Sequence, residues 1–262
     1  MASAARTPRG PTARWFVARA LDGVGPKLAL FDACLATVVA VIGAIVWRVG
    51  GGPRASYEQI VPMLGTGLRW SVALPIAWGA LGAIEADRAA GLLDLARRRG
   101  VPMRRWLLGR ALGASALVTL AVGLPMVVLS LVLAGLGGGL EGAIARLSLV
   151  IPSLVIGAAT GLVFGLGAVV VGALVPSRVL SIGILLAAAS LGVLVDLAVP
   201  GLVGLTAHQV VSPFLALEDL QALLFAVPRT SARGTAAAVA IILLPLLGLR
   251  AAEATLESGA AR

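Results

Sequence analysis

Apolar residues fill long stretches of this chain, and most of its charged residues lie between those stretches. Ala111–Leu140 and Leu147–Ser177 contain no Asp, Glu, Lys or Arg at all. Val179–Val195 and Gly234–Leu249 are shorter and equally free of charge. Because a membrane-crossing helix needs about 20 predominantly apolar residues, each of these four stretches predicts one transmembrane helix.

Two further apolar stretches carry one internal charge each. Leu28–Trp47 contains Asp32 near its start, and Ile60–Ile84 contains Arg69 well inside it. An ionisable side chain at membrane depth costs about 2.5–3.5 kcal/mol or more, so we expect Arg69 to face the bundle interior or to extend toward the interface. With these two stretches included, the pattern predicts an all-α integral membrane protein with a bundle of six transmembrane helices.

Two segments do not fit a straight crossing. Thr12–Lys27 mixes cationic with aromatic and aliphatic side chains and breaks at Gly25-Pro26, which predicts a short N-terminal interfacial helix. A disordered basic tail is the alternative for residues 1–11. Pro200–Arg233 is apolar but is interrupted by three prolines, so we expect short helices that lie on the outer face or dip into it.

The predicted layout has three parts. Residues 1–27 form a cytoplasmic tail and the interfacial helix, residues 28–250 form the six-span transmembrane domain, and residues 251–262 form a second cytoplasmic tail. Within the domain, 85–106 is a cytoplasmic coupling loop and 200–233 is an outer, re-entrant-like segment. Both termini then lie in the cytoplasm, and most of the 21 Lys and Arg residues lie on the inner side, as the positive-inside rule requires.

Composition agrees with a membrane protein and excludes several classes of function. Only 13% of the residues are charged, against about 25% in an average soluble domain. The net charge of +9 does not indicate a nucleic-acid partner, because the cations lie between apolar stretches. The single cysteine, Cys34, and the single histidine, His208, exclude an intrachain disulfide and a metal site with several Cys or His ligands. The preference for Ala, Gly and Arg over Lys suggests a high-GC bacterial genome. For a multi-pass helical protein of that source, the expected location is the bacterial cytoplasmic (inner) membrane.

Residues 85–110 form the most informative of the predicted loops. Glu85 and Asp87 stand at the start of a predicted helix and Arg97–Arg99 at its end, an order that the helix dipole favours. Gly100 can take a left-handed cap, and Pro102 prevents the helix from continuing. The pattern therefore predicts a short amphipathic helix on the cytoplasmic surface.

The same predicted helix carries an apolar patch, formed by Leu92, Leu93 and Leu95. Asp94 can pair with Arg97 or Arg98 one turn further on. The alternative is an ordinary loop whose arginines only hold the membrane topology. Such a loop needs cations alone, whereas this one also has acids at its start, a central Gly91 and a Gly-x-Pro stop.

This arrangement resembles the loop after the second span in the ABC-2 family of ABC-transporter permeases. The family pattern is an acidic residue, Asp/Glu-Arg, x-x-Gly, x-Leu, x-x-Leu, then a Pro and a Gly-Lys/Arg at the next helix. The matching positions in this chain are Glu85, Asp87, Arg88, Gly91, Leu92, Leu95, Pro102, Gly109 and Arg110. The family also has an interfacial helix, six spans and a broken outer segment with a Ser-Pro, here Ser212-Pro213. The resemblance covers almost the whole chain, although only the 85–110 motif is specific, and the Arg97–Arg99 run is more basic than the family pattern.

The resemblance implies a role in ATP-driven export. In that family the loop is the coupling helix, which docks in a groove of a separate ATPase subunit. Two permease subunits, identical or different, work with two ATPase subunits among the membrane lipids, and ATP with Mg²⁺ binds in the ATPase. The coupling residues implied for this chain are Glu85, Asp87, Arg88, Gly91, Leu92 and Leu95.

The sequence has no nucleotide-binding motif of its own. A P-loop needs Gly-Lys-Ser/Thr after a glycine turn, and the single lysine, Lys27, is flanked by Pro26 and Leu28. We therefore assign no catalytic residue, cofactor or metal ligand to this chain, and an ATP-driven mechanism requires another polypeptide.

Smaller features are candidates for packing or transport. One face of the fourth span carries a stripe of small residues that permits close helix approach, within the chain or between subunits: Gly157, Gly161 and Gly165. Arg69 is the candidate pathway residue, because ionisable groups inside spans are functional candidates. Asp32 and Asp196 lie near span ends, where headgroup exposure accounts for them, and the lone His208 is expected to be a polar interface residue.

Two other functions stay open. An ion-gradient-driven secondary transporter has its sites on broken helices at the membrane midplane, and proton-coupled members use carboxylates there. Ala111–Leu140 and Leu147–Ser177 offer no charge for that purpose. A non-transporting membrane anchor or assembly subunit is the third hypothesis, because no substrate-binding residue can be identified from the sequence.

Overall fold

The computed structural model describes residues 13–21, 24–50, 55–136, 140–175, 177–198, 213–225 and 231–258, and every element in these ranges is helical. The elements are α1 (Ala13–Ala20), α2 (Val24–Val49), α3 (Ala55–Leu68), η1 (Arg69–Ala73), α4 (Leu74–Leu81), α5 (Ala83–Ala89), α6 (Leu92–Arg98), α7 (Met103–Gly135), α8 (Leu140–Leu147), α9 (Val150–Thr160), η2 (Gly161–Leu166), α10 (Gly167–Leu174), α11 (Arg178–Ala198), α13 (Pro213–Leu224) and α14 (Ser231–Ser258). Here η1 and η2 are short π-helical segments.

Five helical segments of the described chain are long and apolar enough to cross a membrane. They are Pro26–Val49, Gln59–Ala89, Met103–Gly135, Val150–Leu174 and Ala238–Glu257. The prediction of an all-α membrane protein is confirmed at this level. The stretch expected as the fifth span lies in α11, a helix of 21 residues that is not among the five.

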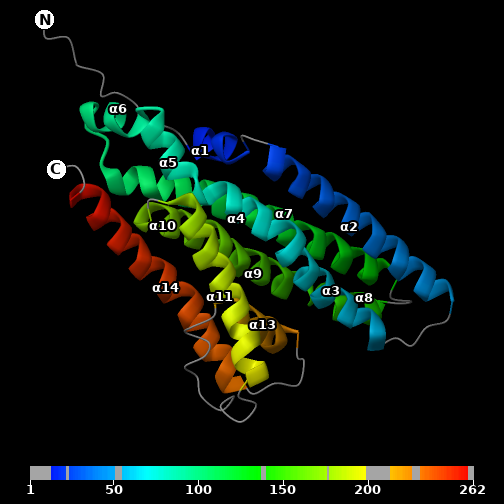
Figure 1. Cartoon of the computed structure of the whole chain (residues 1–262). Coiled ribbons are helices and arrows are strands. Elements are labelled where there is room, and N and C mark those ends of the chain that lie inside the picture. The colour runs from blue at the N-terminus through cyan, green and yellow to red at the C-terminus, as the bar shows by residue number, and fades with distance from the viewer. Residues whose placement is uncertain are drawn as a thin grey trace, which may run out of the picture.

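The helices form an elongated bundle in which α2, α7 and the α3–α4 segment run side by side (Figure 1). The elements α1, α5 and α6 gather at one end, together with the C-terminal end of α14. We call this end of the molecule the platform. The helices α8 and α13 lie away from it.

Apolar side chains remain exposed along the outside of the bundle. Phe31, Val39, Leu120, Ile151 and Leu247 are each more than half exposed. A water-soluble monomer seldom exposes so many large apolar side chains, because their burial is its main source of stability. The exposed apolar surface therefore fits a lipid environment.

The glycine stripe of the fourth span faces α7 of the same chain. A Cβ atom on Gly157 would lie 2.6 Å from the Cα of Gly123, and one on Gly161 would lie 2.6 Å from the carbonyl oxygen of Ser115. Gly165 lies against the backbone of the same serine. The absence of side chains lets the two helices approach to backbone contact, as small residues do between membrane helices.

Helices extend over both ends of the described chain. A short helix, α1, forms in the segment expected to hold the interfacial helix, and it packs on α7, where Phe16 lies against Gly109 and Gly113. The expected C-terminal tail, 251–262, is helical up to Ser258, and its Ala252 and Leu256 are buried. Residues 1–12, 199–212 and 226–230, with His208 and Ser212, lie outside the described ranges, as does the side chain of Asp196.

Candidate functional site

The predicted coupling loop folds as two short helices, α5 and α6, instead of the single helix expected, and α5 is the last part of the crossing segment Gln59–Ala89. The chain bends at Gly91, whose φ of 66° lies in the left-handed region. A residue with a Cβ is unfavourable there, whereas glycine adopts this conformation readily. Gly91 therefore forms the corner of a helix–turn–helix hairpin, and it is exposed.

The end of α6 follows the sequence prediction. Gly100 has a φ of 69°, its N–H donates to the carbonyl of Arg97 at 2.9 Å, and the N–H of Val101 donates to the carbonyl of Ala96 at 2.9 Å. This pair of bonds is the Schellman arrangement that closes a helix on a glycine. Pro102 then precedes the first residue of α7.

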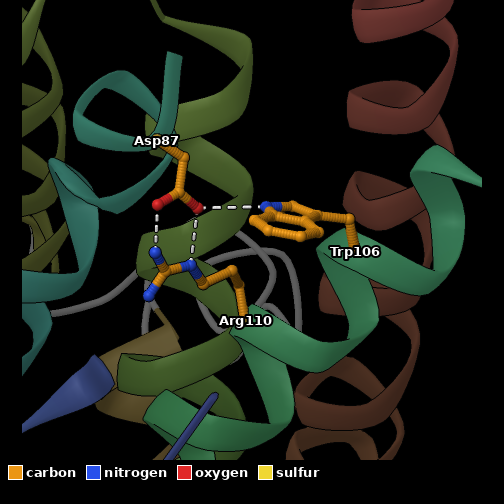
Figure 2. A network of polar contacts seen from close by, with 3 residues as sticks. All are labelled: Asp87, Trp106 and Arg110. Carbon is orange, nitrogen blue, oxygen red and sulfur yellow. Dashed lines mark hydrogen bonds and ion pairs between the residues drawn. The ribbon is translucent and has the colours of Figure 1, made fainter. Parts of the chain in front are cut away.

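A buried carboxylate joins the α5–α6 hairpin to the base of α7. Figure 2 shows Asp87 of α5 facing Trp106 and Arg110, which lie one turn apart on α7. The Nε of Arg110 donates to Oδ2 of Asp87 at 2.7 Å, its second donor nitrogen binds Oδ1, and the indole Nε1 of Trp106 donates to Oδ2 at 3.0 Å. Asp87 is fully buried and Arg110 is 5% exposed.

Three hydrogen-bond donors thus replace the water that the buried Asp87 carboxylate has lost. Burying a charge is costly unless an opposite charge and hydrogen bonds compensate it. A bidentate ion pair between an arginine and a carboxylate does so with a fixed geometry. Removing one member of such a pair typically destabilises a protein by about 3–5 kcal/mol, because the other charge is left buried. The network therefore fixes the orientation of α5 relative to the third span.

Helix α1 covers the same network through its aromatic side chains. The Trp15 ring lies under the guanidinium of Arg110, with its centroid 5.3 Å from the central carbon, which is a cation–π distance. Trp15 and Phe16 also contact the ring of Trp106, at centroid distances of 5.5 and 5.6 Å. Helix α1 is thereby connected to the hairpin through Trp106 and Arg110.

The hairpin is also connected to the last helix. The guanidinium of Arg97 forms an ion pair with Asp94 at 3.3 Å and donates to the carbonyl of Leu256 at 3.1 Å. Leu93 lies in a buried cluster with Leu256 and Trp106. Elements from four parts of the sequence therefore meet at the platform: α1, α5–α6, the start of α7 and the end of α14.

The predicted coupling residues divide into an inner and an outer set. Asp87 lies inside the platform, Leu92 is half-buried, and Leu93, from the predicted patch, faces inward. The outer set is exposed on the hairpin surface and consists of Glu85, Arg88, Gly91 and Leu95. The outward surface thus combines both signs of charge with one large apolar side chain, and we call it the hairpin face.

Sequence reasoning did not identify Trp106 and Arg110 as partners of Asp87. The spacing of Ile84 and Asp87 nevertheless indicated that Asp87 has a buried partner. Ile84 and Asp87 are three residues apart and share a helix face, and that face is buried. An acid that follows an apolar residue on a buried face requires donors, which Trp106 and Arg110 supply from one face of α7.

Arg69 forms the second polar site, inside the second span. Its guanidinium donates to the hydroxyl of Thr66 at 2.9 Å and to the side-chain oxygen of Gln221 on α13. The amide nitrogen of Gln221 in turn donates to the carbonyl of Pro62 at 2.9 Å and to Thr66 at 3.1 Å. Arg69 is 3% exposed, so it faces the interior, one of the two placements expected for it.

Both π-helical segments lie beside this site. Arg69 begins η1, the next residue Trp70 stacks on Phe214 of α13 at 5.7 Å, and Phe214 meets Phe164 of η2 edge-on at 4.7 Å. Such segments interrupt the regular helix and are frequent at functional sites. The sequence did not point to Gln221, because a neutral amide in a proline-broken segment carries no distinguishing spacing.

The described residues offer no group of three or more His, Cys, Asp or Glu side chains that could hold a metal ion. Asp32 is half-buried on α2, and Cys34 is exposed. The buried ionisable side chains of the described ranges are Arg69, Asp87, Arg110 and Asp219.

Comparison of the chain with protein-family models, with curated proteins and with solved structures finds no match. The function must therefore be argued from the platform and the Arg69 site themselves.

Proposed function

We propose that this chain is the transmembrane permease subunit of an ATP-driven exporter of the ABC-2 type, and that it forms the translocation pathway. A separate ATPase subunit would dock on the hairpin face. ATP and Mg²⁺ would bind in that subunit, because the sequence of this chain has no P-loop.

The observation that carries the proposal is the buried network of Asp87, Trp106 and Arg110. A loop that only held topology would need no internal ion pair, whereas a loop that transmits movement needs a stiff connection to a span. The network ties the hairpin to the base of α7, a helix of 33 residues. Movement of the hairpin would therefore tilt or shift the third span directly.

The hairpin face suits a protein partner. Exposed Glu85 and Arg88 offer charges of both signs, which select the register of a partner, and Leu95 offers apolar area, which adds affinity. The corner at Gly91 has nothing within 4 Å of where a Cβ would stand, so a partner surface can approach the backbone there.

The proposal includes six membrane crossings, with both termini in the cytoplasm. Helix α11 would be the sixth crossing, since 21 helical residues extend about 32 Å. The position of α1 and of the end of α14 at the same platform supports an even number of crossings. The platform would lie on the cytoplasmic side of a bacterial inner membrane, where the positive-inside rule puts its arginines.

The assembly would contain a second permease subunit, identical or different, beside the first. In the most apolar part of α2 only 17% of the residues are buried inside the molecule, and in that of α14 only 28% are. These two helices therefore have apolar surface to offer either to lipid or to a partner span.

Co-expression with the ATPase encoded in an adjacent reading frame tests the proposal. We expect a complex that survives purification, and we expect the ATPase rate of the partner to depend on this chain in reconstituted vesicles. If the folded chain is purified and no nucleotide-binding subunit comes with it, the proposal is contradicted.

The Arg69 site favours a second candidate, an ion-gradient-driven secondary transporter. An arginine bound to Thr66 and Gln221 beside a π-helical segment resembles the irregular helices at which such transporters bind their substrates. Loss of transport on collapsing an ion gradient, with ATP intact, would select this candidate. Loss on removing ATP, with the gradient intact, would select the exporter.

A further inference from the structure

A cavity of about 330 Å³ opens at the platform end of the bundle, beside the Asp87 network. Its walls come from α1, α4, α5, α7, α10 and α11, so segments from most of the described chain converge on it. The residues that define it are Arg19, Gly82, Ala86, Arg110, Val169 and Arg178. A volume of this size falls in the range of small-molecule sites.

Three arginines line this one cavity, and they differ in how their charge is used. Arg110 shares its charge with Asp87. Arg178, at the start of α11, is exposed and forms no ion pair within the described ranges. Its side chain lies over Gly82, where an added Cβ would stand 3.5 Å from its Nε. Arg178 therefore offers a guanidinium to an anion that enters the cavity.

The rest of the wall is apolar. Ile76 and Ala80 on α4, Ala114 on α7 and Val169 on α10 also line the cavity. A soluble anion would gain nothing from these side chains. A phospholipid has a phosphate for the arginines and a glycerol backbone with acyl chains for the apolar wall.

We infer that the cavity binds an anionic phospholipid, with its phosphate on Arg178 at the mouth and its glycerol region against Ile76 and Val169. Arg19 contributes a further cation to the wall. A zwitterionic lipid would bring its own cation against these arginines, so a lipid such as phosphatidylglycerol is favoured. Basic pockets between membrane helices bind anionic headgroups in this way.

A lipid in this position would connect α11 to α4 and α5. It would lie next to Arg110 and would reinforce the platform from the membrane side. The inference concerns lipid binding alone, and it holds whether or not an ATPase docks on the hairpin face.

Titration of the purified protein with phosphatidylglycerol, in detergent and followed by native mass spectrometry, tests the inference. We expect Arg178→Gln to raise the half-saturating lipid concentration about fivefold, since one arginine near a membrane surface is worth about 1 kcal/mol toward anionic lipid. The matched control is Arg250→Gln, which removes an exposed arginine of α14 that does not line the cavity. This control should leave the concentration unchanged.

A second variant tests the cavity without changing charge. Gly82→Leu keeps Arg178 and places a side chain in the cavity, and we expect it to weaken binding by a similar factor. If Arg178→Gln fails to fold, Gly82→Leu still tests the inference. Phosphatidylcholine should bind at least about fivefold more weakly than phosphatidylglycerol to the unmodified protein.

Three results would overturn the inference. Equal effects of Arg178→Gln and Arg250→Gln would show that only bulk charge matters. Equal binding of phosphatidylcholine would remove the selectivity for an anionic lipid. Displacement of the lipid by inorganic phosphate at similar concentration would identify a site for a soluble anion instead.

Discussion

Asp87 and Arg110 are 23 residues apart in the chain and form a two-pronged ion pair that is closed to solvent. Asp87 lies on α5, at the end of the crossing segment Gln59–Ala89, and Arg110 lies on α7, near the start of the segment Met103–Gly135. Trp106 donates a third hydrogen bond, and Trp15 covers the guanidinium. This pair joins the hairpin directly to α7.

The first prediction concerns this pair. Asp87→Asn should lower the free energy of unfolding by about 3–5 kcal/mol, because Arg110 loses its counter-charge in a buried site. The double variant Asp87→Leu/Arg110→Met should be less destabilised than the single one, since it buries no charge. Thermal unfolding in detergent measures both. A single variant with an unchanged midpoint would contradict the role of the pair.

The control for this prediction is Asp94→Asn. Asp94 also pairs with an arginine, Arg97, but both side chains are more than one third exposed. Exposed ion pairs contribute about 0–1 kcal/mol, so this variant should unfold close to the unmodified protein.

The second prediction concerns the corner of the hairpin. Gly91→Ala should destabilise the chain by about 1–2 kcal/mol, because its φ of 66° is unfavourable for a residue with a Cβ. The space around it is open, so the cost is conformational and not steric. Gly67→Ala is the control, since Gly67 lies in α3 with ordinary helical geometry and equally open space. That change should be neutral or stabilising, and equal losses in the two variants would contradict the account.

The third prediction concerns the contact between α7 and α9. Gly157→Ala should cost about 1–3 kcal/mol through overpacking, because the new methyl would stand 2.6 Å from the Cα of Gly123. Gly167→Ala is the matched control, because Gly167 has nothing within 4 Å. Thermal unfolding of both variants decides the point, and a stable Gly157→Ala variant would show that the helices do not touch at this position.

The fourth prediction concerns the Arg69 site. Gln221→Ala removes one acceptor from a buried guanidinium, and a hydrogen bond to a charged group is worth about 1.5–3 kcal/mol. The loss should appear in thermal stability, together with weaker attachment of α13 in hydrogen exchange. Gln59→Ala, at an exposed position of α3, should change neither quantity. Unaltered exchange in α13 after Gln221→Ala would contradict the network.

The sequence predicted the helical membrane fold, because hydrophobic length is a local property that tertiary structure does not alter. It also predicted the Gly100 stop and the pairing of Asp94 with Arg97 or Arg98, of which Arg97 is the partner; both features depend on residues within about one turn. It did not predict that Gly91 divides the loop into two helices. A glycine next to helix-forming residues leaves both outcomes open until packing selects one.

The platform could not be derived from the sequence because its contacts are distant in the chain. Asp87 was named from the sequence as one of the coupling residues, and nothing in the sequence showed that it pairs with Arg110 inside the molecule. Arg97 and Leu256 are 159 residues apart, and no periodicity connects them. Charges on an amphipathic helix indicate that they have partners, but only the fold shows which partners are internal.

The central claim is that the hairpin face docks a separate ATPase, and Leu95→Asp tests it most directly. Leu95 and Leu147 are both 45% exposed, and Leu147 lies on α8, away from the platform. The measurement is the amount of the proposed ATPase subunit, co-expressed with this chain, that co-purifies with equal quantities of folded Leu95→Asp and Leu147→Asp proteins. We predict loss of the ATPase from Leu95→Asp and its retention on Leu147→Asp. Full retention on Leu95→Asp, or equal loss from both variants, would contradict the claim.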